Sequence, residues 1–197
     1  LARSFGIFFT ATELKGKNYF GAKIIPARGV WMEIETDADQ TVYCRIDRKR
    51  KFPVTSLLRI LGADTDAKIL DLFKANPEMA KIIGLTLAKD HAKTMQDAYV
   101  EIYKRLRDGD LATAENARSF IQAILKGDRY DISKVGRFRF NKRFGKPMDD
   151  KSLERHTLDV DDVTTTIAHI IMLNTTPDMK ADDIDHLGFR RVRFVGE

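Results

Sequence analysis

The sequence predicts an α+β fold, with a small antiparallel sheet near the N-terminus followed by a mostly helical remainder. Two observations support this prediction. Short runs that alternate between apolar and polar residues occupy the first fifty positions, and beyond them apolar residues recur three and four positions apart, as on a helix face. Because the strands precede the helices instead of alternating with them, α+β fits better than a parallel α/β sheet.

The expected strands begin close to the start of the chain. An apolar run at 7–9 comes first, and a polar turn at 15–17 leads into an extended stretch at 19–25 in which alternate residues are apolar. Pro26 and Gly29 then break the chain before a hairpin. We therefore expect neighbouring strands to pair in an antiparallel sheet.

The hairpin at 28–53 has two chemically different faces, because successive side chains of a strand point to opposite sides. The apolar set, which we expect to be buried, consists of Val30, Met32, Ile34, Val42, Cys44 and Ile46. Cys44 therefore reads as a small buried hydrophobe and not as a nucleophile. The opposite face carries the chain's only tryptophan, Trp31, with Glu33, Glu35, Tyr43 and Arg45.

The two faces limit the pairing register of the hairpin, since a slip of one residue would turn the apolar set of one strand outward. A connection of three residues would place Trp31 opposite Arg45, and a connection of five would place Glu33 there. The pattern leaves two interpretations of Trp31 open. It is either a ring packed beneath a neighbouring element, as most tryptophans are, or a ring that is exposed for binding.

The rest of the chain is predicted to be largely helical. Pro53 suits a first helical turn, Gly62 suits the position after a helix end, and Thr113 and Asp159 are candidate N-caps. The stretch 147–155 is predicted to be a polar loop. The expected helices span 53–61, 65–75, 79–88, 92–107, 114–126 and 159–173.

Basic and aromatic residues are interleaved at 128–146, where seven Lys and Arg side chains accompany four aromatic rings. Such a mixture is typical of surfaces that follow a phosphate backbone. The alternative, which the pattern favours, is that the rings anchor the core and the cations form a solvated face.

Composition limits the classes of function. The 197 residues can bury a real core in one large or two small domains, and 34 Lys and Arg against 29 Asp and Glu permit a polyanionic partner without requiring one. A single cysteine excludes a disulfide framework and a cysteine zinc site. No apolar run approaches the roughly 18 residues that span a membrane, and no signal peptide is visible, so we expect a cytoplasmic protein.

No catalytic signature is present. The sequence lacks the glycine-rich phosphate loops, the paired-histidine zinc motif and the nucleophile elbow of known enzyme classes. Asp182, Asp183, Asp185 and His186 have ligand atoms for a divalent cation, but acids beside arginines more often form an ion-paired turn. The residues alone therefore predict a binding or scaffold module, with no catalytic and no metal-binding residue.

Motifs along the whole chain resemble the bacterial RNA polymerase β-subunit family, in the family's order. The end segment Asp183-Ile-Asp-His-Leu-Gly-x-Arg-Arg-x-Arg-x-Val-Gly-Glu197 carries the resemblance most clearly. Further matching motifs lie at 1–9, 22–31, 45–51, 101–107, 114–118 and 129–141. The resemblance implies one domain, 1–197, corresponding to the β lobe, in which 1–9 and 182–197 join the lobe to the neighbouring protrusion. We accordingly expect the chain to be a piece of a longer protein.

The resemblance also implies a function in transcription by DNA-directed RNA polymerase, a nucleotidyltransferase. The lobe of that enzyme lines the DNA channel and contacts the non-template strand near the start site. Carried over by motif, Trp31 stacks on an unpaired base. Arg3, Ile184, Asp185 and Arg190 form a pocket for a flipped guanine, in which Asp185 accepts hydrogen bonds from the base. Sequence-independent charge along the channel would come from Arg45, Arg48, Lys49, Arg50 and Lys51.

Two residues depart from the family pattern: Phe5 stands where proline is usual, and Phe189, beside the guanine pocket, stands where asparagine is usual. The family also implies that the catalytic Mg²⁺ is held by another subunit, so this chain alone is expected to need no cofactor and to be non-catalytic. Its implied partners are the non-template strand, the downstream duplex, the β′ and α subunits and sigma factor, in a nucleoid-associated enzyme with no membrane contact. Two alternatives remain: a docking module for sigma and regulatory factors with little DNA binding, and a metal-dependent nuclease built on Asp183, Asp185 and His186.

Overall fold

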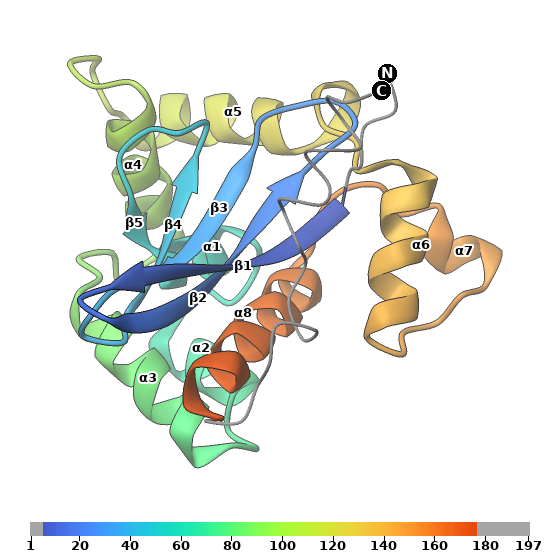
Figure 1. The fold of residues 1–197 in the computed structure, drawn as a ribbon. Helices are drawn as coiled ribbons and strands as arrows, with labels where there is room; N and C mark the ends of the chain where they lie inside the picture. The colour runs from blue at the N-terminus through green and yellow to red at the C-terminus, as the bar shows by residue number, and fades with distance from the viewer. Residues whose placement is uncertain (1–5, 177–197) are drawn as a thin grey trace.

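Residues 6–176 are described by the computed structural model, and they form a five-stranded antiparallel sheet with helices packed against it. The strands follow one another in chain order, β1-β2-β3-β4-β5, so every strand pairs with its neighbour in sequence (Figure 1). The strands are β1 (Gly6–Leu14), β2 (Lys17–Ile25), β3 (Met32–Thr36), β4 (Val42–Ile46) and β5 (Phe52–Pro53). The helices are α1 (Val54–Ile60), α2 (Asp66–Leu72), α3 (Pro77–Ala88), α4 (Met95–Leu106), α5 (Ala114–Leu125), η1 (Gly127–Arg129), α6 (Ser133–Arg143), α7 (Asp150–Leu153) and α8 (Val160–Thr175). The predicted α+β class is confirmed.

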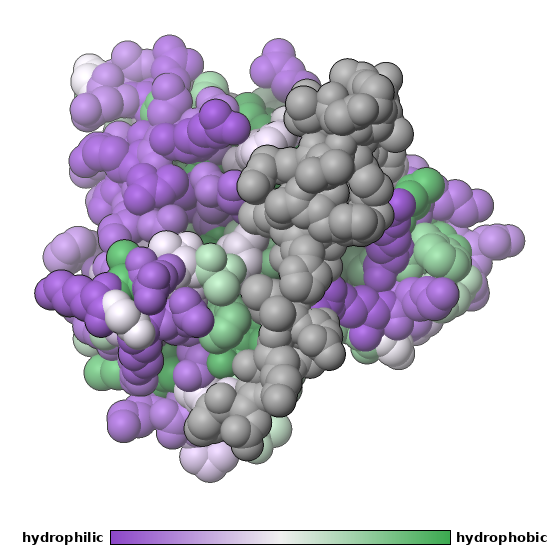
Figure 2. All heavy atoms as spheres, viewed as in Figure 1, coloured by the Kyte–Doolittle hydropathy of each residue, from purple (hydrophilic) through white to green (hydrophobic). Residues whose placement is uncertain are grey.

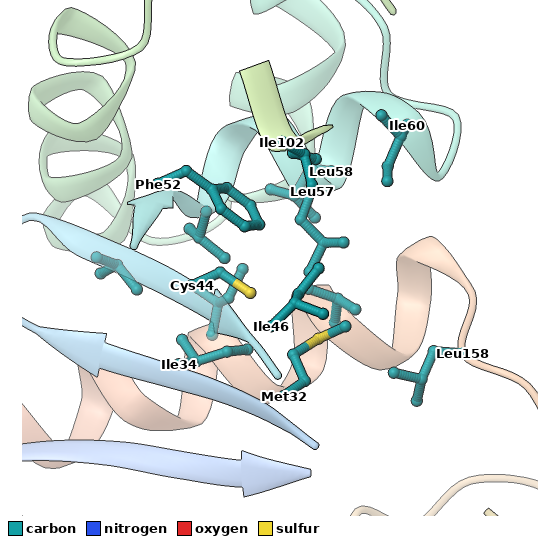
Figure 3. Packing of buried hydrophobic residues seen from close by; sticks show 14 of the residues in the cluster. Met32, Ile34, Cys44, Ile46, Phe52, Leu57, Leu58, Ile60, Ile102 and Leu158 are labelled. Carbon is teal, nitrogen blue, oxygen red and sulfur yellow. The ribbon is translucent and has the colours of Figure 1, made fainter. Parts of the chain in front are cut away.

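The sheet and the helices share a core on one side of β3 and β4, where every second residue is buried. Met32, Ile34 and Ile46 project from these strands toward Leu57 and Leu58 of α1 (Figure 3). Cys44 lies in the same layer with no exposed surface, and burial raises the pKa of its thiol far above the ordinary value. It is the small buried hydrophobe that the strand pattern predicts. The opposite face of β3 and β4 carries polar and charged side chains.

The β1–β2 hairpin reaches beyond the rest of the sheet. Nine residue pairs join β1 to β2, but only three join β2 to β3. The side chain of Asn174, at the end of α8, closes the junction: its Oδ1 accepts from the Phe20 amide at 2.9 Å, and its Nδ2 donates to Thr36 Oγ1, also at 2.9 Å. The Thr36 hydroxyl then donates to the Phe20 carbonyl at 2.7 Å. One amide side chain therefore joins β2, β3 and α8.

A buried ion pair fixes α6 to the start of α8. The Arg137 guanidinium donates to both carboxylate oxygens of Asp162, at 2.7 and 2.8 Å, and neither side chain has any exposed surface. Arg137 also donates to the carbonyls of Arg155 and Thr157, at 2.7 and 2.9 Å. Burial by itself would raise the pKa of Asp162, but the hydrogen bonds and charge of Arg137 outweigh it and lower that pKa.

The helix predictions hold for most elements and are wrong at a few. Thr113 and Asp159 cap α5 and α8 as predicted, the latter in a capping box. Pro53 was expected in a helix but belongs to β5, where it pairs with Tyr43 and precedes α1. The predicted loop at 147–155 contains the short helix α7, and the basic and aromatic stretch contains α6. Within 6–176, none of the helices combines the length and apolar character that crossing a bilayer requires.

Candidate nucleic-acid interface

The β3–β4 hairpin has the register with the longer connection. Glu33 lies opposite Arg45, and Thr36 lies opposite Val42, so five residues connect the strands. The alternative with Trp31 opposite Arg45 is wrong. Inside the connection, the Asp37 amide donates to the Thr41 carbonyl at 3.0 Å, which lets the strands pair up to that point. Both faces of the hairpin are therefore as the alternation predicts, with the charged residues on the side away from the core.

Trp31 lies at the edge of this charged face and is half-buried. Its carbonyl accepts a hydrogen bond from the Asp47 amide at 2.9 Å, which continues the ladder one step beyond β3. The Arg48 guanidinium lies over the indole ring, 5.1 Å from the ring centroid. The ring is neither sealed in the core nor bare, because the Arg48 guanidinium lies over it, and its role in binding stays a prediction.

A tight turn places Arg48 over the ring. The Lys49 amide donates to the Ile46 carbonyl at 3.1 Å, and the two residues between them, Asp47 and Arg48, have φ values of 56° and 59°. These are features of a type I′ turn, which normally takes Asn, Asp or Gly at both central positions. An arginine in the left-handed region costs about 1–2 kcal/mol. The strained backbone is therefore what aims the Arg48 side chain at Trp31.

The other predicted cations are mostly paired with carboxylates. Arg45 lies 3.2 Å from Glu35 and also donates to the Lys49 carbonyl at 3.0 Å. Lys51 lies 2.9 Å from Asp37. Arg48 and Lys49 are exposed, and neither makes an ion pair with any residue among 6–176. A polyanion could therefore bind Arg48 and Lys49 without displacing a carboxylate partner among the described residues.

Arg50 connects the turn to the end of α4. Its guanidinium donates to the Lys104 carbonyl at 3.1 Å and lies 3.6 Å from Asp108. Between the turn and the helix end is a shallow open groove of about 610 Å³. Six cations and one carboxylate line it together with one leucine: Arg45, Arg48, Lys49, Arg50, Arg105, Leu106, Arg107 and Asp108. We call this surface the basic groove.

The cations of α4 in the basic groove were not identified as site residues from the sequence. Arg105 and Arg107 lie at the C-terminal end of a helix, where cations complement the helix dipole, and both form local ion pairs, with Glu101 at 2.8 Å and Asp110 at 2.9 Å. Nothing in their spacing relates them to the turn at 46–49, more than fifty residues away. The one available signal was the family resemblance at 101–107.

The remaining predicted site residues lie outside the described part of the chain. These are the four residues of the guanine pocket, the two departures from the family pattern and the candidate cation ligands: Arg3, Phe5, Asp182, Asp183, Ile184, Asp185, His186, Phe189 and Arg190. Their roles stay predictions. Within 6–176, three carboxylates do lie within 4.8 Å of one another, at Asp159, Asp161 and Asp162. Arg137, Arg155 and Lys146 already neutralise them, so they form part of the ion-pair network at the start of α8.

The basic and aromatic stretch at 128–146 fits neither of its two interpretations completely, namely a phosphate-following surface or core rings with a solvated charged face. Tyr130 and Phe140 are buried core anchors, as the favoured interpretation predicts, but so is the cation Arg137. Phe138 has 42% of its surface exposed, which the favoured interpretation does not predict. The outer side of α6 is therefore partly apolar, and it lies apart from the basic groove (Figure 1).

Comparison with known proteins gives one consistent result. Residues 5–193 match the family model described as RNA polymerase Rpb2, domain 2. The chain is 40% identical over 199 residues to the DNA-directed RNA polymerase subunit beta of Syntrophomonas wolfei, and 40% identical over 210 residues to that of a Nocardioides species. It is 39% identical over 211 residues to the same subunit of Streptomyces coelicolor. All of this chain is covered in each case, but only 17%, 17% and 18% of the three relatives.

Proposed function

Because this chain belongs to the RNA polymerase Rpb2 domain 2 family, we propose that it is the lobe of a DNA-directed RNA polymerase β subunit, and that its charged face lines the DNA channel. In this proposal the chain contacts the non-template strand near the transcription start site. The observation that carries the proposal is the juxtaposition of Trp31, Arg48 and the basic groove on one side of the sheet. Figure 2 shows hydrophilic residues over the region where Figure 1 places β3, β4 and β5.

The chemistry of this face suits single-stranded nucleic acid. An indole ring offers a stacking surface to any base, and cations along a groove follow the phosphates without reading sequence. Arg48 covers the ring in the free protein, so a base must either displace the guanidinium or be sandwiched between it and Trp31. The unpaired Lys49 and the paired Arg50 then lie within the groove, where phosphates would follow the stacked base.

Base selectivity would come from the predicted pocket of Arg3, Ile184, Asp185 and Arg190. A carboxylate such as Asp185 can accept hydrogen bonds from the N1–H and N2–H groups of guanine, which no other base presents in the same arrangement. Nucleotidyl transfer itself would take place elsewhere in the enzyme, at a Mg²⁺ site on another subunit. The role proposed for this chain is to hold the strand, in contact with the β′ and α subunits and sigma factor.

The decisive experiment removes the ring in the whole polymerase. Trp31→Ala should weaken the contact with the non-template strand by about 1–3 kcal/mol, the usual range for a base–aromatic stack. The measurement is the lifetime of the open promoter complex, together with crosslinking of the non-template strand at the start site.

Trp31→Phe is the matched control, because it retains an aromatic face and should keep most of the lifetime. Equal lifetimes for the alanine variant and the unchanged enzyme would show that Trp31 does not stack on the strand. Equal losses for alanine and phenylalanine would point to the packing of the indole and not to a stack.

A second candidate function follows from the ion pairs on the same face. Because Arg45, Arg50 and Lys51 are already paired with carboxylates, the isolated surface offers less free charge than its sequence suggests. The chain would then serve mainly to dock sigma or regulatory factors. Titration of the isolated chain with single-stranded DNA at several salt concentrations distinguishes the two. A phosphate-binding surface gives a slope near −0.7 per contact in log K against log salt, and a docking surface gives almost none.

A further inference from the structure

Both sides of α6 mix polar and apolar residues. Its inner side buries Arg137 and Asn141, two polar residues, beside Gly136 and Phe140. Two of its apolar side chains point outward instead: Val135 is 48% exposed and Phe138 is 42% exposed. The helices α4 and α5, by contrast, bury the apolar side of an ordinary amphipathic pattern. Val135 and Phe138 leave apolar surface in contact with water. Packing against an apolar group of a partner would bury that surface, which is favourable.

Cations without acidic partners surround these two side chains. Lys134, Arg139 and Lys142 are exposed, and none of them forms an ion pair with a residue among 6–176. Lys142 lies over the Phe138 ring, 5.9 Å from the centroid. We call the five residues Lys134, Val135, Phe138, Arg139 and Lys142 the α6 patch.

The α6 patch stands on a rigid support. Arg137, on the opposite side of the helix, is held by Asp162 and by two backbone carbonyls. Asn141 donates to the Pro147 carbonyl at 2.9 Å, which ties the segment after the helix back against it. A surface that is already ordered loses little conformational entropy on binding. Figure 1 shows α6 and α7 standing out from the sheet, and Figure 2 shows green spheres among purple ones over these helices.

We propose that the α6 patch is a docking site for an acidic amphipathic segment of a separate protein. The segment would place an apolar side chain against Val135 and Phe138 and carboxylates against Lys134, Arg139 and Lys142. Charge complementarity selects the acid, and the aliphatic Val135 argues for a protein occupant, because a nucleic acid offers phosphates and bases but no apolar side chain. The patch lies on a different element from the basic groove, so this inference does not depend on the DNA contacts proposed above.

The test places a photoreactive benzoylphenylalanine at position 138 in the assembled polymerase, purified with its bound proteins. We expect an adduct with a separate protein, and mass spectrometry should map it to a segment with two or more carboxylates within one helical turn of an apolar residue. The same probe at Leu111, which is 78% exposed but lies outside the patch, should give no such adduct.

A charge-reversal variant then tests the mechanism of docking. Arg139→Glu with Lys142→Glu should lower the adduct yield and weaken binding of the mapped protein about tenfold. Replacing the mapped carboxylates by lysine should restore binding to this variant. Retention of the assembled polymerase on size exclusion verifies that the variant folds.

Three outcomes would overturn the proposal: an adduct with DNA or RNA, an adduct with another part of the same subunit, or no adduct beyond the Leu111 background. A mapped segment without carboxylates, or one whose binding ignores the charge reversal, would overturn it as well.

Discussion

Arg48 occupies a backbone conformation that glycine would adopt without strain. Its φ of 59° is in the left-handed region, as the type I′ turn from Ile46 to Lys49 requires at both central residues. We predict that Arg48→Gly makes the chain about 1–2 kcal/mol more stable than Arg48→Ala, since only glycine relieves the strain. Denaturant unfolding of the two variants measures the difference.

Both Arg48 variants lack the guanidinium, so both should lose the same affinity for single-stranded DNA. A glycine variant that bound DNA as tightly as the unchanged protein would remove Arg48 from the proposed interface. If the Arg48→Ala and Arg48→Gly variants were equally stable, the backbone of the turn would not be strained at Arg48.

Asp162 is a fully buried carboxylate in an ion pair, so its substitution should be costly. Asp162→Asn would leave the Arg137 guanidinium buried without its counter-ion, a change that typically costs about 3–5 kcal/mol. The double replacement Arg137→Met with Asp162→Leu removes both charges and should cost less than the single one. Thermal or urea unfolding would measure the loss of stability in both variants. A larger loss in the double variant would show that the unpaired charge of Arg137 is not the main cost.

The lowered pKa of Asp162 also gives the pair a pH dependence. A carboxyl whose pKa is lower in the folded than in the unfolded chain contributes stability above its ordinary pKa of about 3.9. This stability is lost as the pH falls through the lowered value. As the pH falls below about 4, the unchanged protein should therefore lose stability more steeply than the Asp162→Asn variant does.

At the scale of elements, a close approach between two distant segments requires glycine. Gly29 has φ +124°, and a Cβ there would lie 2.8 Å from both the Arg129 carbonyl oxygen and the Tyr130 ring. We predict that Gly29→Ala destabilises the chain more than Gly62→Ala does. Gly62 has a similar φ of +132° but open space around it, so its substitution costs only the backbone strain of about 1–2 kcal/mol.

The comparison of these two glycine variants by thermal unfolding isolates the clash from the strain. Equal losses would mean that the segments 27–29 and 129–131 can separate without cost. Such a result would be unexpected, because Ala27 and Arg28 both donate to the Asp131 carbonyl, at 2.8 and 3.1 Å.

Elements with one apolar face could be predicted from the sequence, and α6 shows why others could not. The hairpin faces and the caps Thr113 and Asp159 depend on residues close together in sequence. On α6, the buried side includes Arg137 and the exposed side includes Phe138, so its apolar residues mark no single face. The helix is held by an ion pair with a residue 25 positions away, which periodicity does not reveal.

The same limit applies to the site. Trp31 and Arg45 lie on one hairpin, so their shared face followed from alternation, whereas the choice between the two registers did not. The cations at 48–51 were implied only by the family resemblance. The sequence did not indicate that Arg48 covers the indole, nor that carboxylates pair with several of the cations. Those facts depend on side-chain packing and on φ at two turn residues.

At the scale of the whole molecule, the basic groove joins segments that only the fold brings together. We predict that Arg105→Ala with Arg107→Ala lowers the magnitude of the salt slope for single-stranded DNA by about 1.4, or about 0.7 for each lost contact. The affinity of the chain at several salt concentrations measures it.

The matched control is Lys68→Ala with Lys74→Ala, which removes the same charge from exposed ion pairs on and beside α2. Its slope should be unchanged. Equal changes in the two variants would mean that net charge, and not the groove, governs binding.

The order of the strands has a consequence for synthesis on the ribosome. Because each strand pairs with the one before it, the sheet can form as soon as residues 6–53 have emerged. The Phe20 amide, however, receives its Asn174 acceptor only 154 residues later. At about 5–20 residues per second, that delay is roughly 8 to 31 s. During this time the outer half of the β1–β2 hairpin lacks its last anchor, so the nascent chain is most open there to pairing with a wrong strand.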